Sequence, residues 1–73
     1  MNVSDEARKM RDAREERLRR LLFKEMKNGN YHAAGRVTRI RDAYIIGVAT
    51  RDEEEWDDIW RIAQRSLNGL DAI

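Results

Sequence analysis

Acidic side chains crowd around two tryptophans in the segment TRDEEEWDDIW, residues 50–60. Hard cations prefer carboxylate ligands, which this segment offers at Asp52 to Glu55 and at Asp57 and Asp58. A calcium loop of the EF-hand type also needs a central glycine for its sharp turn and a glutamate at a fixed offset, and neither is present. The segment therefore predicts no metal site. Acidic residues are instead typical of the first turn of a helix, where the helix dipole favours each by about 0.3–1 kcal/mol.

Side chains suited to catalysis are scarce. The chain has one histidine, His32, and a nucleophile needs a base beside it that is itself oriented by a third group. Cysteine is absent, which excludes thiolate nucleophiles and cysteine-bound zinc. The sequence has no phosphate-binding GxxxxGK motif and no GxGxxG motif. We therefore expect neither an enzyme nor a cofactor, and we expect His32 to be a solvated or partly packed residue of a helix.

Charge is abundant and divided along the sequence. Charged residues make up 40% of the chain, against roughly 25% in an average domain, although the net charge is only +1. Residues 1–41 hold 12 Lys and Arg against 6 Asp and Glu, whereas residues 42–73 hold 3 against 8. The first part is therefore basic (+6) and the second acidic (−5). This division lets the chain attract partners of either sign, unlike the uniformly basic chain of a dedicated nucleic-acid binder.

Length and hydropathy limit the size and the location of the protein. The 73 residues form one domain, 1–73, whose core contributes only roughly 3–5 kcal/mol. No run of about 18 apolar residues is present, and the opening MNVSDEARKMR leads directly into a charged helical pattern. Because the lack of cysteine also suits a reducing compartment, we expect a cytoplasmic protein without membrane contact.

Capping residues divide the chain into three helices. Ser4 is a good N-cap, Asn28-Gly29 is a C-cap, and Asn30 can begin a second helix. Thr50 or Asp52 can begin a third, with a capping-box pattern three residues after Thr50. The expected helices are residues 4–28, 30–48 and 52–67, followed by a short tail at 68–73.

Apolar residues at spacings of three and four give each helix one core-facing stripe. The stripes are Leu18, Leu21, Leu22 and Met26 in the first helix, Ala34, Val37, Ile40, Tyr44, Ile45 and Val48 in the second, and Trp56, Ile59, Trp60, Ala63 and Leu67 in the third. The first helix is roughly 36 Å long and the second roughly 28 Å. Because the first helix is also poor in apolar residues before Arg17, we expect its N-terminal part to be under-buried. Short connections make neighbouring helices antiparallel, which predicts an all-α, three-helix up-down bundle.

Two segments allow a second interpretation. The β-branched run YIIGVA, Tyr44 to Ala49, is also compatible with a strand, but no second strand is available to pair with it. Phe23 lies well away from the centre of the leucine stripe, so it is either packed under the third helix or exposed beside Arg19 and Arg20. Trp56 and Trp60 are expected in the core, each with a partner for its indole N–H.

Arginine dominates the remaining surface and indicates a binding role. Arginine beside an exposed aromatic side chain is a common composition of an interaction hot spot. The alternative is a solvated, ion-paired face with helical pairs such as Glu16 and Arg20. The candidate partner-binding residues are Arg11, Arg14, Arg17, Arg20, Phe23 and Arg36.

As a whole, the chain resembles the small transcription regulators of Xanthomonas oryzae bacteriophages that bind the host RNA polymerase. The likeness covers all 73 residues and rests on the length, the opening MNVSDEARKMRDAREERLRR, the arginine-rich composition and the segment NGNYHAAGRVTRIRD. It implies a non-enzymatic protein of the host cytoplasm that contacts the polymerase β and β′ subunits, inhibits σ-dependent initiation and promotes read-through of terminators. No functional residue is carried over by a motif.

Three other functions stay open. A designed helical mini-protein that binds a receptor has the same fold and size, although designs usually avoid glycines such as Gly35 and Gly47 inside helices. A nucleic-acid-binding module would use the first helix or the GRVTRIR face, because DNA would repel the acidic start of the third helix. A homodimeric coiled coil would place Leu22, Phe23 and Met26 at its seam, whereas the main prediction is a monomer.

Overall fold

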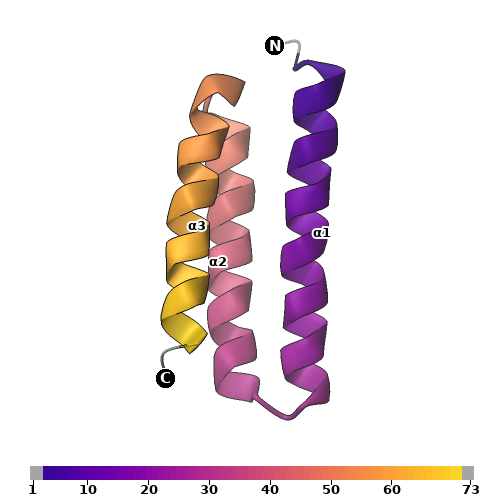
Figure 1. Cartoon of the computed structure of the whole chain (residues 1–73), viewed down its shortest axis with the longest axis vertical. Helices are drawn as coiled ribbons and strands as arrows, with labels where there is room; N and C mark the ends of the chain where they lie inside the picture. Colours follow the sequence, from indigo (N-terminus) through magenta and orange to yellow (C-terminus); the bar gives the residue numbers. More distant parts are fainter. Residues whose placement is uncertain (1–2, 72–73) are drawn as a thin grey trace.

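The computed structural model describes residues 3–71, which form three α-helices that run alternately up and down (Figure 1). The helices are α1 (Asp5–Lys27), α2 (Tyr31–Thr50) and α3 (Trp56–Asp71), with the single 3₁₀ turn η1 (Glu53–Glu55) before α3. No strand occurs within residues 3–71, and Tyr44 to Ala49 lie inside α2. The all-α, three-helix up-down bundle is therefore confirmed, and the strand interpretation is excluded.

Three helix ends differ from the prediction: α2 ends at Thr50 instead of residue 48, α3 begins at Trp56 instead of residue 52, and α3 ends at Asp71 instead of residue 67. The Thr50 hydroxyl donates to the carbonyl oxygen of Ile46 (2.9 Å), so Thr50 belongs to the last turn of α2 and the predicted capping box is wrong. The third helix continues through Asn68-Gly69 to Asp71, because Gly69 does not adopt the positive φ that would end a helix there. Residues 72–73 of the expected tail lie outside the described residues.

The reversal between α1 and α2 is made at Gly29, whose φ of 76° lies in the left-handed region that glycine tolerates best. The Gly29 N–H donates to the Met26 carbonyl (3.1 Å) and the Asn30 N–H donates to the Glu25 carbonyl (2.8 Å). This pair of bonds is the Schellman arrangement that closes a helix C-terminus. The Asn30 side chain does not cap α2, since its amide nitrogen donates to the Glu25 carboxylate instead (2.9 Å).

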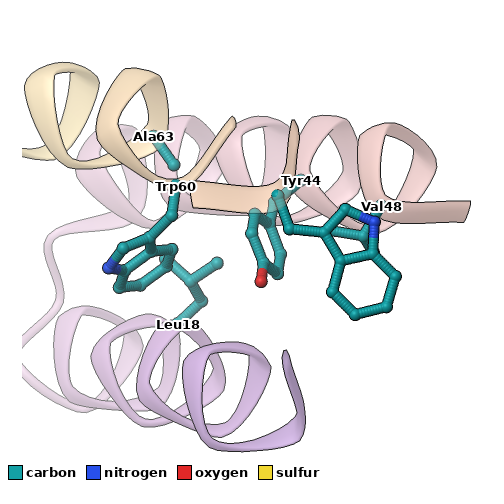
Figure 2. Close-up of a cluster of buried hydrophobic side chains, with 6 residues drawn as sticks. Leu18, Tyr44, Val48, Trp60 and Ala63 are labelled. Carbon is teal, nitrogen blue, oxygen red and sulfur yellow. The ribbon is translucent and has the colours of Figure 1, made fainter. Parts of the chain in front are cut away.

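The core lies between the three helices and is built mainly from α2 and α3 (Figure 2). Its buried cluster consists of Leu18, Tyr44, Val48, Trp56, Trp60 and Ala63. The Tyr44 and Trp60 rings meet edge to face, with centroids 5.4 Å apart and planes at 70°, an arrangement that aromatic pairs prefer. The Trp56 indole N–H donates to the Arg51 carbonyl (3.1 Å). Both tryptophans therefore lie in the core, as predicted.

The N-terminal part of α1 has few buried residues but does not project from the bundle. Leu18 is the one fully buried residue of α1, which agrees with the predicted under-burial before Arg17. The rest of the predicted stripe is less buried than expected, since Leu21 and Leu22 are half-buried, and the prediction is wrong at Met26, which is 47% exposed. However, Val3 and Ala7 pack against the core cluster, and the Ser4 backbone N–H donates to the Glu53 carboxylate (3.1 Å). The start of α1 is thereby attached to η1, and the Ser4 hydroxyl caps α1 by accepting from the Ala7 N–H (3.2 Å).

Candidate functional site

Two of the predicted partner-binding arginines lie between α1 and α3. The Arg11 guanidinium is 5.5 Å from the centroid of the Trp56 ring, and the Arg14 guanidinium is 5.4 Å from that of Trp60. Arg14 also donates to the Asp57 carboxylate (2.8 Å), and only 17% of its side chain is exposed. These contacts connect the basic helix to the acidic start of α3, so both arginines serve the fold.

The position of these arginines follows the helical repeat of α1. The spacing of three and four that joins Leu18 to Leu21 continues backwards through Arg14, Arg11 and Ala7. A prediction that counts only apolar residues stops at Leu18, although an arginine has an apolar stem and a flat cation that stacks on aromatic faces. The sequence nevertheless contains a pattern that predicts this contact, because arginines occupy core positions of one helix and tryptophans occupy core positions of another.

The Tyr44 hydroxyl lies inside this interface. It points from α2 towards α1 (Figure 2), is buried, and has no hydrogen-bond partner among the described residues. Burial raises the pKa of the Tyr44 phenol, while the neighbouring Arg14 guanidinium acts in the opposite direction. Burial therefore favours the neutral form of the Tyr44 phenol.

Two other predicted residues, Arg17 and Arg20, line an open groove of about 710 Å³. Its lining residues come from the C-terminal halves of α1 and α3 and from the first turns of α2. These parts of the helices lie at the end of the bundle that holds the α1–α2 turn (Figure 1). Its apolar lining consists of Leu18, Leu21, Ala33, Val37, Leu67 and Leu70. Its polar lining consists of Arg17, Arg20, Lys24, Glu25, Asn30, His32, Gln64 and Asn68.

The basic side of the groove is a single row on α1. Arg17, Arg20 and Lys24 are spaced i, i+3 and i+7, so they follow one edge of the helix over two turns. All three residues are exposed. The one acidic side chain of the lining, Glu25, already accepts a hydrogen bond from Asn30. Sequence reasoning missed Lys24, although its spacing from Arg17 and Arg20 places it in the same row.

Phe23 lies on the outside of α1, with 54% of its surface exposed. The Arg19 guanidinium is 5.4 Å from its ring centroid, so the interpretation that Phe23 is exposed beside arginine is the correct one. Arg19 in turn makes two hydrogen bonds to Glu16 (2.9 and 2.8 Å), and Arg20 makes a third (3.3 Å). Mainly because of the bonds from Arg19, the pKa of Glu16 is lowered to about 2. This part of α1 is thus the ion-paired face that the alternative interpretation predicted.

The remaining candidates are dispersed. Arg36 is exposed on α2 and does not line the groove. His32 is exposed and lines the groove, which agrees with the expected solvated residue. Met26 and Tyr31 are also exposed, at 47% and 71%, near the α1–α2 turn. The structure therefore divides the six candidates into a core pair (Arg11, Arg14), a groove pair (Arg17, Arg20) and two separate surface residues (Phe23, Arg36).

Within the described residues, no three His, Cys, Asp or Glu side chains are grouped so that they could hold a metal ion. In the same part of the chain, every helix is too short or too polar to cross a membrane.

The chain matches no family model, no curated protein and no solved structure.

Proposed function

We propose that the chain is a transcription regulator without enzymatic activity that acts by binding bacterial RNA polymerase. The observation that carries the proposal is the groove, where a row of three cations borders an apolar hollow in a bundle of only 73 residues. Arginine at the edge of an apolar pocket is a frequent source of binding energy between proteins, and the surrounding charges steer association. The resemblance of the opening segment and of the NGNYHAAGRVTRIRD segment to phage regulators supplies polymerase as the partner.

The proposed contact surface is narrower than the sequence prediction. Arg17 and Phe23 are exposed to a partner, and so is Arg20, whose side chain is 79% exposed although it donates to Glu16. Arg36 can contribute only if the partner also reaches α2. Arg11 and Arg14 are engaged with tryptophans of α3, so they support the surface without forming it. By the resemblance, the partner subunits are β and β′, and the consequences are reduced σ-dependent initiation and increased terminator read-through.

A pull-down from a bacterial lysate tests the proposal, with the tagged chain as bait. We expect the wild type to retain the β and β′ subunits and the variant Arg17→Ala/Arg20→Ala/Phe23→Ala to lose most of them. The matched control is Arg61→Ala/Arg65→Ala, which removes two exposed arginines of α3 outside the groove. Transcription in vitro from a σ-dependent promoter followed by a terminator measures both expected effects. Failure to retain polymerase, or unchanged inhibition by the triple variant, would contradict the proposal.

A homodimer is the second candidate, because Phe23 and Met26 are 54% and 47% exposed on the same part of α1. A coiled-coil seam requires this kind of neighbouring exposed apolar pair. Sedimentation of the wild type and of Phe23→Ser decides between the two. A dimer that the substitution dissociates favours the second candidate, and a monomer in both cases excludes it.

A further inference from the structure

We infer that the groove between α1 and α3 binds an acidic amphipathic helix of a partner protein. The inference rests on the proposed protein-binding function and specifies the chemistry of the segment that is bound. Four features of the molecule support it: the helical walls of the groove, its apolar lining, the row of cations on α1, and the burial of the tryptophans beside the chain's own acidic segment.

The walls of the groove favour a helical ligand over an extended one. All three walls are α-helices whose backbone groups are mostly paired within the helix, so the groove offers no sheet edge to which a strand could be added. A ligand must therefore satisfy its own backbone, which a helix does. The groove follows α1 from Arg17 to Glu25, about 12 Å at 1.5 Å per residue, and this length matches about two turns of a bound helix.

The size and lining of the groove suit the apolar stripe of such a helix. A volume of about 710 Å³ is within the usual range of ligand pockets, about 300–1,000 Å³. The hollow is lined by the half-buried side chains of Leu21 (α1), Ala33 (α2), Leu67 and Leu70 (α3), whereas Leu18 and Val37 lie fully buried beneath it. Over two turns, an amphipathic helix presents apolar anchors at i, i+3 or i+4, and i+7, which can enter the hollow side by side.

The charge of the rim sets the sign of the partner. Arg17, Arg20 and Lys24 stand at i, i+3 and i+7 along one edge, and Gln64 and Asn68 on the α3 side are neutral. Carboxylates at a similar helical spacing on the ligand can pair with this row, whereas lysines would be repelled. Among the side chains that the structure describes, those of residues 3–70, no carboxylate lies at ion-pair distance from Arg17 or Lys24. Both cations are thus available to a partner.

The chain's own acidic segment is a poor occupant for the groove of a second copy. Residues 52–58 are acidic, but the apolar side chains of that region, Trp56 and Trp60, are buried in the core at 5% and 9% exposure. The acidic segment of a second copy therefore offers carboxylates without an exposed apolar stripe. Duplex DNA lacks the stripe as well, since it presents phosphates to a cationic row and nothing to fill the hollow. A separate protein segment with both features fits best.

Fluorescence anisotropy with three labelled peptides of about 16 residues tests the inference at about 0.1 M salt. The first peptide is an amphipathic helix with a leucine stripe flanked by glutamates, the second carries lysine in place of each glutamate, and the third is a scramble of the first. We expect binding of the first peptide only. The groove variant Arg20→Glu/Lys24→Glu should weaken this binding about tenfold. The control variant Lys27→Glu/Arg36→Glu changes the net charge equally outside the groove and should weaken it by no more than about twofold.

A second variant separates the hollow from its charged rim. Ala33→Phe fills the hollow without changing any charge and should also weaken binding of the acidic peptide, while circular dichroism verifies that each variant is folded. The inference is overturned if the scramble or the lysine peptide binds as well as the first, or if both charge variants lose binding equally. It is also overturned if duplex DNA shows the same dependence on the groove, or if the chain is a dimer that Arg20→Glu/Lys24→Glu dissociates.

The peptide assay tests the inferred ligand of the groove, and the polymerase assay tests the proposed function, so either claim can be contradicted without the other. Peptide binding that depends on the groove, without retention of polymerase, supports the inference and contradicts the proposed partner. Retention of polymerase that Arg20→Glu/Lys24→Glu and Ala33→Phe leave unchanged supports the proposed function and contradicts the inference.

Discussion

Replacing Arg14 with alanine tests whether an arginine holds the bundle together. The side chain lies 5.4 Å from the centre of the Trp60 ring, donates to Asp57 at 2.8 Å and is 17% exposed. Arg17 is one turn further along the same helix and is exposed. Arg17→Ala is therefore a matched control that makes the same change in charge and in helix propensity. The difference between the two variants reports the contacts of Arg14 alone.

Three contributions set the expected magnitude for Arg14→Ala. Loss of the cation–π contact with Trp60 costs about 0.5–1 kcal/mol, and loss of the ion pair with the largely exposed Asp57 costs about 0.2–1 kcal/mol. Loss of the packed arginine stem adds to these costs. We expect Arg14→Ala to destabilise the fold by about 1–2 kcal/mol, a large part of the roughly 3–5 kcal/mol that so small a core provides. Arg17→Ala should stay within about 0.5 kcal/mol of the wild type.

Urea unfolding followed by circular dichroism at 222 nm measures both variants, with the midpoint as the readout at constant slope. Arg14→Lys is the informative intermediate, because lysine keeps the charge and most of the stem but loses the flat stacking surface. A double-mutant cycle with Asp57→Ala isolates the ion pair, whose coupling should be below about 1 kcal/mol. Equal stability of Arg14→Ala and Arg17→Ala would refute the structural role of Arg14.

Three further predictions concern glycine, acid and a buried phenol. Gly35→Ala should raise the free energy of unfolding by about 0.5–1 kcal/mol, since nothing lies within 4 Å of the added Cβ. Gly47→Ala should give no gain in stability, because its Cβ would stand 3.1 Å from the side chain of Ile59 in α3. Urea unfolding of both variants checks these two expectations. The Glu16 pKa is lowered from 4.5 to about 2, chiefly by the hydrogen bonds of Arg19, so its pairing stabilises the fold above pH 4.5 and this stabilisation is lost as the pH falls towards 2. Glu16→Gln should remove that part of the acid response of the melting temperature, and an unchanged profile contradicts the pairing. Tyr44→Phe should leave the stability within about 0.5 kcal/mol or raise it, because it removes a buried hydroxyl without a partner. Burial raises the Tyr44 pKa above its ordinary value of 10.0, so the wild type loses stability when the pH rises above 10.0 and the phenol ionises in the unfolded chain. Tyr44→Phe has no phenol to ionise, so its melting temperature should fall less than that of the wild type at alkaline pH.

Local sequence determined the three helices and the residues that α2 and α3 contribute to the core. Ser4 caps α1, Gly29 closes it, and the stripes of α2 and α3 are buried or half-buried where their spacing predicts. These features depend on residues within one or two turns of each other, so caps and periodicity are sufficient to predict them. The helix ends that were wrongly predicted near Thr50 and Gly69 also have a local cause. A threonine or a glycine ends a helix only when the neighbouring backbone leaves the helical conformation, and at these two positions it does not.

Only the tertiary structure decided which arginines face inwards and which remain available. Arg11 and Arg14 differ little in sequence context from Arg17 and Arg20, yet the first pair stacks on tryptophans and the second pair borders an open groove. The difference arises because α3 presents two indoles opposite the N-terminal half of α1 and only smaller side chains opposite its C-terminal half. What lies opposite a residue depends on how separate helices dock. The spacing within α1 places an arginine on the inner face, but it does not say whether that face meets an aromatic ring or an open hollow.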